Sequence, residues 1–418
     1  MRKISCVLIL LGVVAVWKMA RVSATVPARS DANVPFEHVI IDSHAPLNQW
    51  AIGAGDISGD GQPDVVSSGE GPMEPGATGK GGGLYWYEYP TWTKHVIDAN
   101  GTFADDMQLV DVDGDGDLDI VVPEDSTKQV RWYENPRPRG NPATDPWKVH
   151  VIGSYAPFHF EEAHDVEVAD LNGDGKVDVV IANQKWQLPR PGKDQPEQVV
   201  FFQNNPNRWT PVVVSHTYGE GTCLADLNHD GRIDIVKGGW WLENPGDPLH
   251  DPWPQHWIVR GWPDRAGVTV ADINQDGRPD VVLAAAETTG RLAWFEGPPD
   301  AIHGTWTEHL IQDHVDFVHT FKVADINLDG QPDVVFSEMQ DSVEKRVGFF
   351  LNQGKGTSWK LQVIANTGSH NIRVVDIDHD GDFDIVGANY NSESDPRHAP
   401  LELWRNLLID HRTSRSGK

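Results

Sequence analysis

The chain has 418 residues, of which 39% are hydrophobic and 23% are charged. With 17 Trp and 13 Phe it is too apolar for a disordered chain, and its hydrophobic runs are too broken for a polytopic membrane protein. Its net charge of −28 argues against binding of duplex nucleic acid, which needs a basic surface. Cys6 and Cys223 are the only cysteines, so a disulfide framework is excluded.

The N-terminus is typical of an export signal. An apolar run, Val7–Trp17, follows two basic residues and precedes the small residues Val22–Ala24, a suitable cleavage site. The run is shorter than the ~20 residues that a membrane-spanning helix needs. We therefore expect a signal peptide over 1–24, a linker over 25–34, and an exported mature chain without a transmembrane segment. Lys18, directly after the run, leaves an uncleaved anchor as the alternative.

An aspartate-rich phrase of nine residues recurs along the whole mature chain. A short run of alternating apolar and polar residues precedes each copy, and a β-branched run follows it. Next come an aromatic strand such as Trp132–Glu134 and a fourth strand such as His150–Ile152. Four short strands in a repeat of ~50 residues are typical of one propeller blade. The seven copies begin at Asp56, Asp111, Asp170, Asp226, Asp272, Asp325 and Asp376.

The fourth-strand phrases predict how the ring closes. His38–Ile40 precedes the first aspartate loop, whereas the last aromatic strand, Leu403–Asn406, has no such phrase after it. We therefore expect an all-β, seven-bladed β-propeller over 35–408, with four antiparallel strands per blade. The N-terminal strand should complete the last blade and leave no open edge. Residues 409–418 should form a disordered tail.

The aspartate loops carry side-chain oxygens at positions 1, 3, 5 and 9 and glycine at position 6. Hard oxygen ligands around a glycine turn suit Ca²⁺, which takes 6–8 oxygens. No loop has Glu at position 12 and no helical pattern follows, so these are not EF-hands. We expect up to seven structural Ca²⁺ ions, with metal-free solvated turns as the alternative. The predicted ligands are Asp56, Ser58, Asp60, Asp64, Asp111, Asp113, Asp115, Asp119, Asp170, Asn172, Asp174, Asp178, Asp226, Asn228, Asp230, Asp234, Asp272, Asn274, Asp276, Asp280, Asp325, Asn327, Asp329, Asp333, Asp376, Asp378, Asp380 and Asp384.

These D-x-[DNS]-x-D-G-x-x-D loops between short strands resemble FG-GAP/VCBS repeats, as in the calcium-binding propeller heads of integrin α chains. The aromatic strands that end in Asn-Pro, at Trp132–Pro136 and Trp241–Pro245, are similar to the propeller domain of aldos-2-ulose dehydratases. The cupin portion of that family is missing here. The resemblance implies a calcium-binding propeller and an activity directed at sugars.

One position of the repeat predicts a functional site. The residue six places before each loop should converge on the propeller axis at one mouth of the ring. In the seven blades this position holds Trp50, Asp105, His164, Glu220, Ala266, His319 and His370. Three imidazoles and two carboxylates are more polar groups than the packing of a propeller requires. His164, His319 or His370 would act as a general base, while Asp105 and Glu220 would orient it or bind an additional divalent cation. Hydrated polar lining of a channel is the alternative.

Two functions of different classes fit this mouth. The first is a lyase or dehydratase that eliminates from a uronate polymer or keto-sugar, with a histidine as base and a cation stabilising the enolate. The second is a non-catalytic recognition or adhesion propeller that binds a glycan or a protein partner. Histidines turned away from the axis, or a mouth filled by Trp50, would favour the second.

Other histidines share a single position of the fourth strand. Because two of the seven blades hold Val212 and Gln362 there, we expect a structural role rather than ligand binding. The five are His38, His95, His150, His256 and His309.

Overall fold

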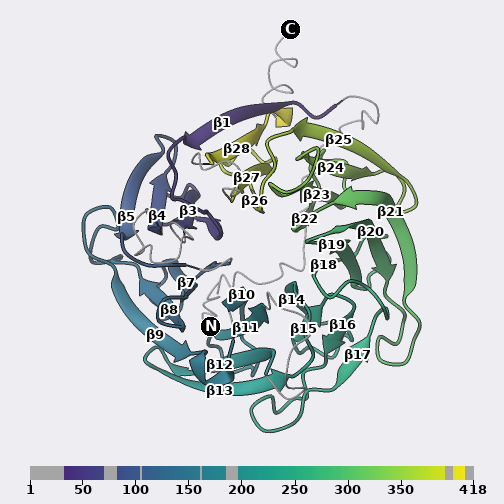
Figure 1. Cartoon of the computed structure of the whole chain (residues 1–418), viewed down its shortest axis with the longest axis horizontal. Coiled ribbons are helices and arrows are strands. Elements are labelled where there is room, and N and C mark those ends of the chain that lie inside the picture. Colours follow the sequence, from purple (N-terminus) through teal and green to yellow (C-terminus); the bar gives the residue numbers. More distant parts are fainter. Residues whose placement is uncertain are drawn as a thin grey trace, which may run out of the picture.

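The computed structural model describes residues 33–69, 82–103, 106–160, 162–184, 196–390 and 399–409. Its strands, β1–β28, form seven sheets of four antiparallel strands arranged around a central axis (Figure 1). This confirms the predicted all-β propeller with seven blades. No helix within the described ranges is long and apolar enough to span a membrane.

The strands of each blade run from the axis outward. The innermost strands are β2 (Ile52–Gly55), β6 (Gln108–Val110), β10 (Glu162–Ala169), β14 (Thr222–Ala225), β18 (Ala266–Ala271), β22 (Thr320–Ala324) and β26 (Asn371–Val375). The second strands are β3 (Asp64–Gly69), β7 (Asp119–Glu124), β11 (Asp178–Gln184), β15 (Asp234–Lys237), β19 (Asp280–Ala285), β23 (Asp333–Ser337) and β27 (Asp384–Ala388). The third strands are β4 (Gly83–Glu88), β8 (Gln129–Glu134), β12 (Gln198–Asn205), β16 (Trp240–Leu242), β20 (Thr289–Glu296), β24 (Val347–Asn352) and β28 (Leu401–Asn406). The outer strands are β5 (Thr93–Asp98), β9 (Lys148–Ser154), β13 (Arg208–Ser215), β17 (Gln255–Trp257), β21 (Thr307–Asp316), β25 (Trp359–Ala365) and β1 (Phe36–Asp42).

The N-terminal strand closes the ring as predicted. β1 pairs antiparallel with β28, with Val39 opposite Leu403, and so provides the outer strand of the seventh blade (Figure 1). Two residues just outside the predicted propeller bounds contact the propeller. Val34, assigned to the linker, is buried, and its N–H and carbonyl pair with the Gln362 amide at 2.9 and 2.7 Å. Ile409, assigned to the tail, donates its N–H to Asp382 at 2.8 Å; residues 1–32 and 410–418 lie outside the described ranges.

The core lies between neighbouring blades. All six residues of β7 and of β19 are buried, because each sheet is covered on both faces by the adjacent sheets. This double burial explains why the second strands read as continuous β-branched runs instead of alternating polar and apolar residues.

The outer-strand histidines are structural, as expected. The imidazole of His150 stacks on Trp132 with ring centroids 4.0 Å apart, and its Nε2 lies 2.6 Å from Glu134. Four other blades repeat this His–Trp–Glu arrangement, with His38 on Trp404 and Glu402, His95 on Trp86 and Glu88, His256 on Trp241 and Glu243, and His309 on Trp294 and Glu296. In the other two blades, Val212 faces Val200 and Gln362 faces Phe349.

Amide side chains tie five of the seven blades to the one before. Asn244, directly after β16, donates from Nδ2 to the Leu171 carbonyl in the aspartate loop of the preceding blade, at 2.8 Å. Four further pairs repeat this bond: Asn135 to Ile57, Gln203 to Val112, Asn352 to Ile273, and Asn406 to Ile326. These bonds position neighbouring blades, and hence the innermost strands that surround the axis.

Candidate functional site at the axial mouth

Each aspartate loop wraps its backbone around its first carboxylate. In the fifth loop, the N–H groups of Asp276 and Gly277 each donate to Asp272 at 2.9 Å. The last aspartate, Asp280, accepts from the N–H of Ile273 at 2.8 Å and from the N–H of Gly297, directly after the third strand, at 2.9 Å. The glycine at position 6 is required by conformation, since Gly277 has a φ of 89° and a Cβ there would meet nothing within 4 Å.

The second and seventh loops gather carboxylates most tightly. Ligand oxygens of Asp111, Asp113 and Asp115 lie within 4.8 Å of one another, and so do those of a second trio, Asp376, Asp378 and Asp384. Burial and nearby carboxylates raise the pKa of Asp119 and that of Asp384 to about 8. An all-oxygen set of clustered carboxylates fits a hard cation such as Ca²⁺.

The axial mouth brings the predicted histidines together. His164 lies on β10, whereas His319 and His370 directly precede β22 and β26, so the three imidazoles come from the third, sixth and seventh blades. Ring centroids of His164 and His319 are 5.5 Å apart, and those of His319 and His370 are 4.1 Å apart. The imidazoles therefore meet near the axis. Asp105, the remaining predicted carboxylate of the set besides Glu220, lies outside the described residues.

Trp50 covers one side of this cluster. Its indole packs edge-on against His370 at 4.8 Å and stacks on Tyr390 at 4.6 Å between ring centroids. His370 is 3% exposed and Trp50 is 6% exposed, so this side of the mouth is filled by side chains. His164, His319 and Glu220 instead line an open pocket.

Burial makes two of the imidazoles poor bases. Burial and the neighbouring His164 lower the pKa of His319 to about 3. Burial and the adjacent His319 hold the pKa of His370 well below its usual value. Both rings are therefore neutral near pH 7, and their weak basicity does not suit proton abstraction.

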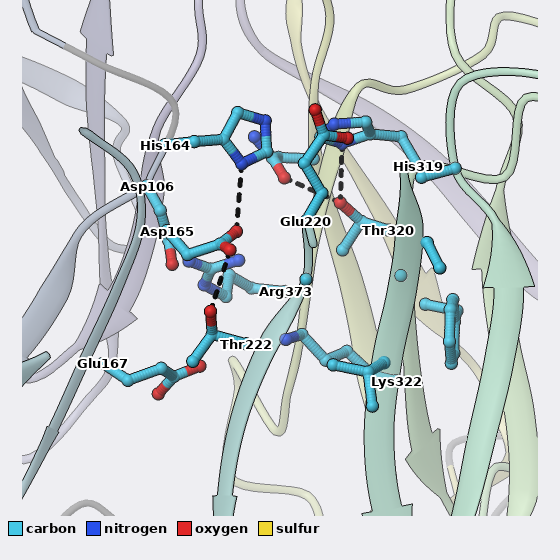
Figure 2. A pocket seen from close by; sticks show the side chains of 17 residues that line it. Asp106, His164, Asp165, Glu167, Glu220, Thr222, His319, Thr320, Lys322 and Arg373 are labelled. Atoms are coloured by element: carbon cyan, nitrogen blue, oxygen red, sulfur yellow. Dashed lines mark hydrogen bonds and ion pairs between the residues drawn. The ribbon is translucent and has the colours of Figure 1, made fainter. Parts of the chain in front are cut away.

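His164 has the partner that a general base needs. Its Nδ1 lies 3.0 Å from Asp165, which also accepts from Thr222 at 2.9 Å (Figure 2). Lys237 lies 3.5 Å from the same carboxylate. Although burial acts to raise it, the charges of His164 and Lys237 hold the pKa of Asp165 well below its usual range. This carboxylate stays ionised and orients the imidazole. Lys237 is completely buried, and burial lowers its pKa.

Two glutamates share one arginine beside the histidines. Arg265 lies 3.4 Å from Glu220 and forms an ion pair with Glu287. Burial raises the pKa of Glu220. One ligand atom each of His164, His319 and Glu287 lies within 4.8 Å of the others. The sequence analysis missed Glu287. Glu287 follows the last aspartate of its loop by seven residues, and Gln340, which contacts His370 at 3.3 Å, follows the last aspartate of its own loop by the same number. This shared repeat position is the signal that could have found it.

A pocket that is partly open to solvent extends from this cluster along the innermost strands (Figure 2). Arg373 and Asp106 form an ion pair across it at 2.6 Å. Burial and Asp106 raise the pKa of Glu167 to about 8. Charged lining residues that sequence reasoning missed, among them Glu167, Lys322 and Arg373, follow Asp165, Thr320 and Asn371 by two places. The two-residue period of a strand, which puts alternate residues on one face, could have found them.

Comparisons with known proteins identify the repeats. The FG-GAP-like repeat family matches over residues 111–181, 170–236, 272–336 and 325–387. No curated protein is similar enough to count as a match.

Solved structures share the fold at low sequence identity. An Agrocybe aegerita lectin that recognises non-reducing terminal N-acetylglucosamine has a TM-score of 0.50 and 16% identity, over 80% of this chain and 81% of the lectin. The V. cholerae biofilm matrix protein Bap1 has a TM-score of 0.47 and 11% identity, over 90% of this chain and 91% of its own. At 16% identity, the likeness to the lectin establishes the fold alone.

Proposed function

The chain belongs to the FG-GAP-like repeat family, and from that premise we propose that it is an exported, calcium-braced propeller that binds carbohydrate in its axial pocket. The pocket lining carries this proposal. Acceptors on Asp106 and Glu167 and donors on Lys322 and Arg373, from four different blades, face one concave site. Sugar hydroxyls both donate and accept hydrogen bonds, so they match a lining of mixed donors and acceptors.

Export and calcium belong to the same proposal. The apolar run Val7–Trp17 supports export from the cytoplasm. Outside the cytoplasm, Ca²⁺ is abundant enough to fill weak sites. The carboxylates of the seven loops would hold the ions and link the turns that join the first and second strands of each blade. The tight carboxylate trios of the second and seventh loops support this assignment.

Elimination from a bound sugar is the second candidate function, and the His164–Asp165 pair favours it. Nδ1 of His164 faces Asp165, which leaves Nε2 to accept a proton. In a lyase or dehydratase reaction, this nitrogen would take the proton next to a carboxylate or carbonyl carbon. The electron pair of that C–H bond would form the new C=C bond, and the C–O bond of the β-carbon would break. The leaving oxygen would depart with a proton as an alcohol or water.

The test uses the full chain in excess Ca²⁺. A glycan panel of neutral, N-acetylated and uronate sugars is screened first, and hits are measured by calorimetry. We expect saturable binding that is about tenfold or more weaker in Lys322→Met, because a hydrogen bond to a charged group contributes about 1.5–3 kcal/mol. Lys355→Met, at an exposed turn, is the matched control and should bind normally.

Each result has a defined meaning. Absence of saturable binding across the panel, or equal weakening in both lysine variants, would refute carbohydrate binding in the pocket. Absorbance of an unsaturated product that disappears in His164→Ala would establish elimination. Binding without such absorbance would leave a recognition propeller and rule out the second candidate.

A further inference from the structure

The cluster of His164, His319 and Glu287 has the composition of a transition-metal site. Figure 2 shows His164 and His319 at the same end of the pocket, on either side of Glu220. One ligand atom from each of the three residues lies within 4.8 Å of the other two. Two imidazoles and one carboxylate suit zinc, cobalt or iron, whereas Ca²⁺ takes oxygen ligands.

Two buried polar atoms beside the cluster give an independent observation. Nε2 of His370 and Oε2 of Glu220 have no hydrogen-bond partner within the described part of the chain, although these residues are only 3% and 2% exposed. The His370 ring packs on His319 at 4.1 Å, and Glu220 shares Arg265 with Glu287. Buried polar atoms are almost always paired, so an imidazole nitrogen and a carboxylate oxygen without a protein partner here point to a further polar partner beside the cluster, such as a cation.

The local charge also favours a cation. Glu220 and Glu287 share the single guanidinium of Arg265, while Asp165 is already paired with Lys237. In the neutral form that binds a metal, the imidazoles carry no charge, and these five side chains together hold one formal negative charge in excess. A divalent ion would balance that charge, and Arg265 would remain paired with Glu220.

We propose that His164, His319 and Glu287 bind one divalent transition-metal ion at the axial mouth. His370 packs on His319, and Glu220 shares Arg265 with Glu287, so both residues lie beside this site. This site goes beyond carbohydrate binding and does not depend on it. It does compete with the base role of His164, because a nitrogen lone pair that binds a metal cannot accept a proton.

The experiment separates this site from the calcium loops. The full chain is stripped of transition metals with a chelator that spares calcium, kept in excess Ca²⁺, and titrated with Co²⁺ and with Zn²⁺. Calorimetry gives the stoichiometry, and the visible absorption of bound Co²⁺ reports imidazole ligation. We expect one equivalent per chain, with binding lost in His319→Ala and weakened about tenfold or more in Glu287→Gln.

Matched controls are available on the surface. His303→Ala and Glu308→Gln remove an exposed imidazole and an exposed carboxylate, and both should retain full binding. Lys322→Met should keep the metal while losing sugar, which separates this proposal from the proposed function. His164→Asn, checked for folding by its urea midpoint in Ca²⁺, gives a second ligand variant if His319→Ala does not fold. No binding by the unaltered chain, or equal loss in His303→Ala, would overturn the proposal.

Discussion

Glu167 is an acidic side chain in a place that disfavours its charged form. Its carboxyl lies on β10 inside the pocket, near the carboxylate of Asp106 and the cations of Lys322 and Arg373. Burial is the main cause that raises its pKa to about 8, and Asp106 adds to the effect. The folded protein therefore holds a proton on this group at pH values where the unfolded chain has released it.

This residue should make stability depend on pH. Because the folded pKa is raised, its contribution is fully present below about pH 4.5 and is lost as the pH rises toward 8. Glu167 keeps some surface open to the pocket, so the slope should be less than about 1.4 kcal/mol per pH unit. Glu167→Gln should flatten it, making the variant more stable than the unaltered chain at pH 8.5 and equal at pH 4.5.

Urea unfolding midpoints at several pH values, all in excess Ca²⁺, would measure this. Parallel profiles for the two proteins would show that Glu167 titrates alike in the folded and unfolded states, contrary to the expectation.

Residue patterns predicted part of the pocket. Alignment on the aspartate loops located His164, Glu220, His319 and His370 because these residues share one repeat position. It could not locate Lys237, since this lysine, on the second strand of the fourth blade, reaches Asp165 on the third blade. Contacts across blades leave no fixed spacing in the sequence.

At the scale of elements, the blades depend on a few bonds between sheets. Asn244 donates to Leu171 of the preceding blade at 2.8 Å and to Ile233 of its own loop at 3.1 Å. Its own N–H donates to the loop aspartate Asp234 at 2.9 Å. The residue is fully buried, so this one amide links a third strand to two aspartate loops.

Asn244→Ala should therefore destabilise the propeller. Removal of the amide leaves two carbonyls without this donor in the interior, a loss of about 1–3 kcal/mol in the free energy of unfolding. Asn366→Ala is the control, since that exposed side chain makes a single bond to Glu344 and should cost less than about 0.5 kcal/mol. Equal losses in the two variants, measured by urea unfolding, would contradict a role in holding blades together.

The strands themselves were predictable, but the bonds between blades were not. Continuous β-branched runs such as those of β7 and β19 follow from burial on both faces, and the surplus phrase His38–Ile40 predicted closure by β1. The acceptors of the Asn244 bonds are backbone carbonyls, which every residue carries. A side-chain pattern therefore indicates the donor at most, and never its partner.

At the scale of the whole molecule, the aspartate loops and the axial mouth lie at opposite ends of the innermost strands. His319 precedes β22 and the sixth loop follows it, and the other blades repeat this order. Calcium in the loops would therefore act on the ring as a whole and not on the pocket directly. Seven ions would also halve the net charge of −28 and so reduce self-repulsion in the folded chain.

Removal of calcium should consequently lower the melting temperature of the entire propeller. A site that is filled at a hundred times its Kd contributes about 2.7 kcal/mol, so several sites should together shift melting by many degrees. Salt screens the repulsion between carboxylates that the chelator exposes. Added NaCl should therefore restore part of the melting temperature of the chelated protein and change that of the calcium-loaded protein little.

Asp111→Asn, in the tightest loop, should lower the calcium-loaded melting temperature, whereas Asp313→Asn, an exposed aspartate outside the loops, should not. Scanning calorimetry with and without chelator, and with and without added NaCl, gives all of these comparisons. A melting temperature that stays the same after complete calcium removal would mean that hydrogen bonds such as Asp280 to Ile273 hold the loops without an ion.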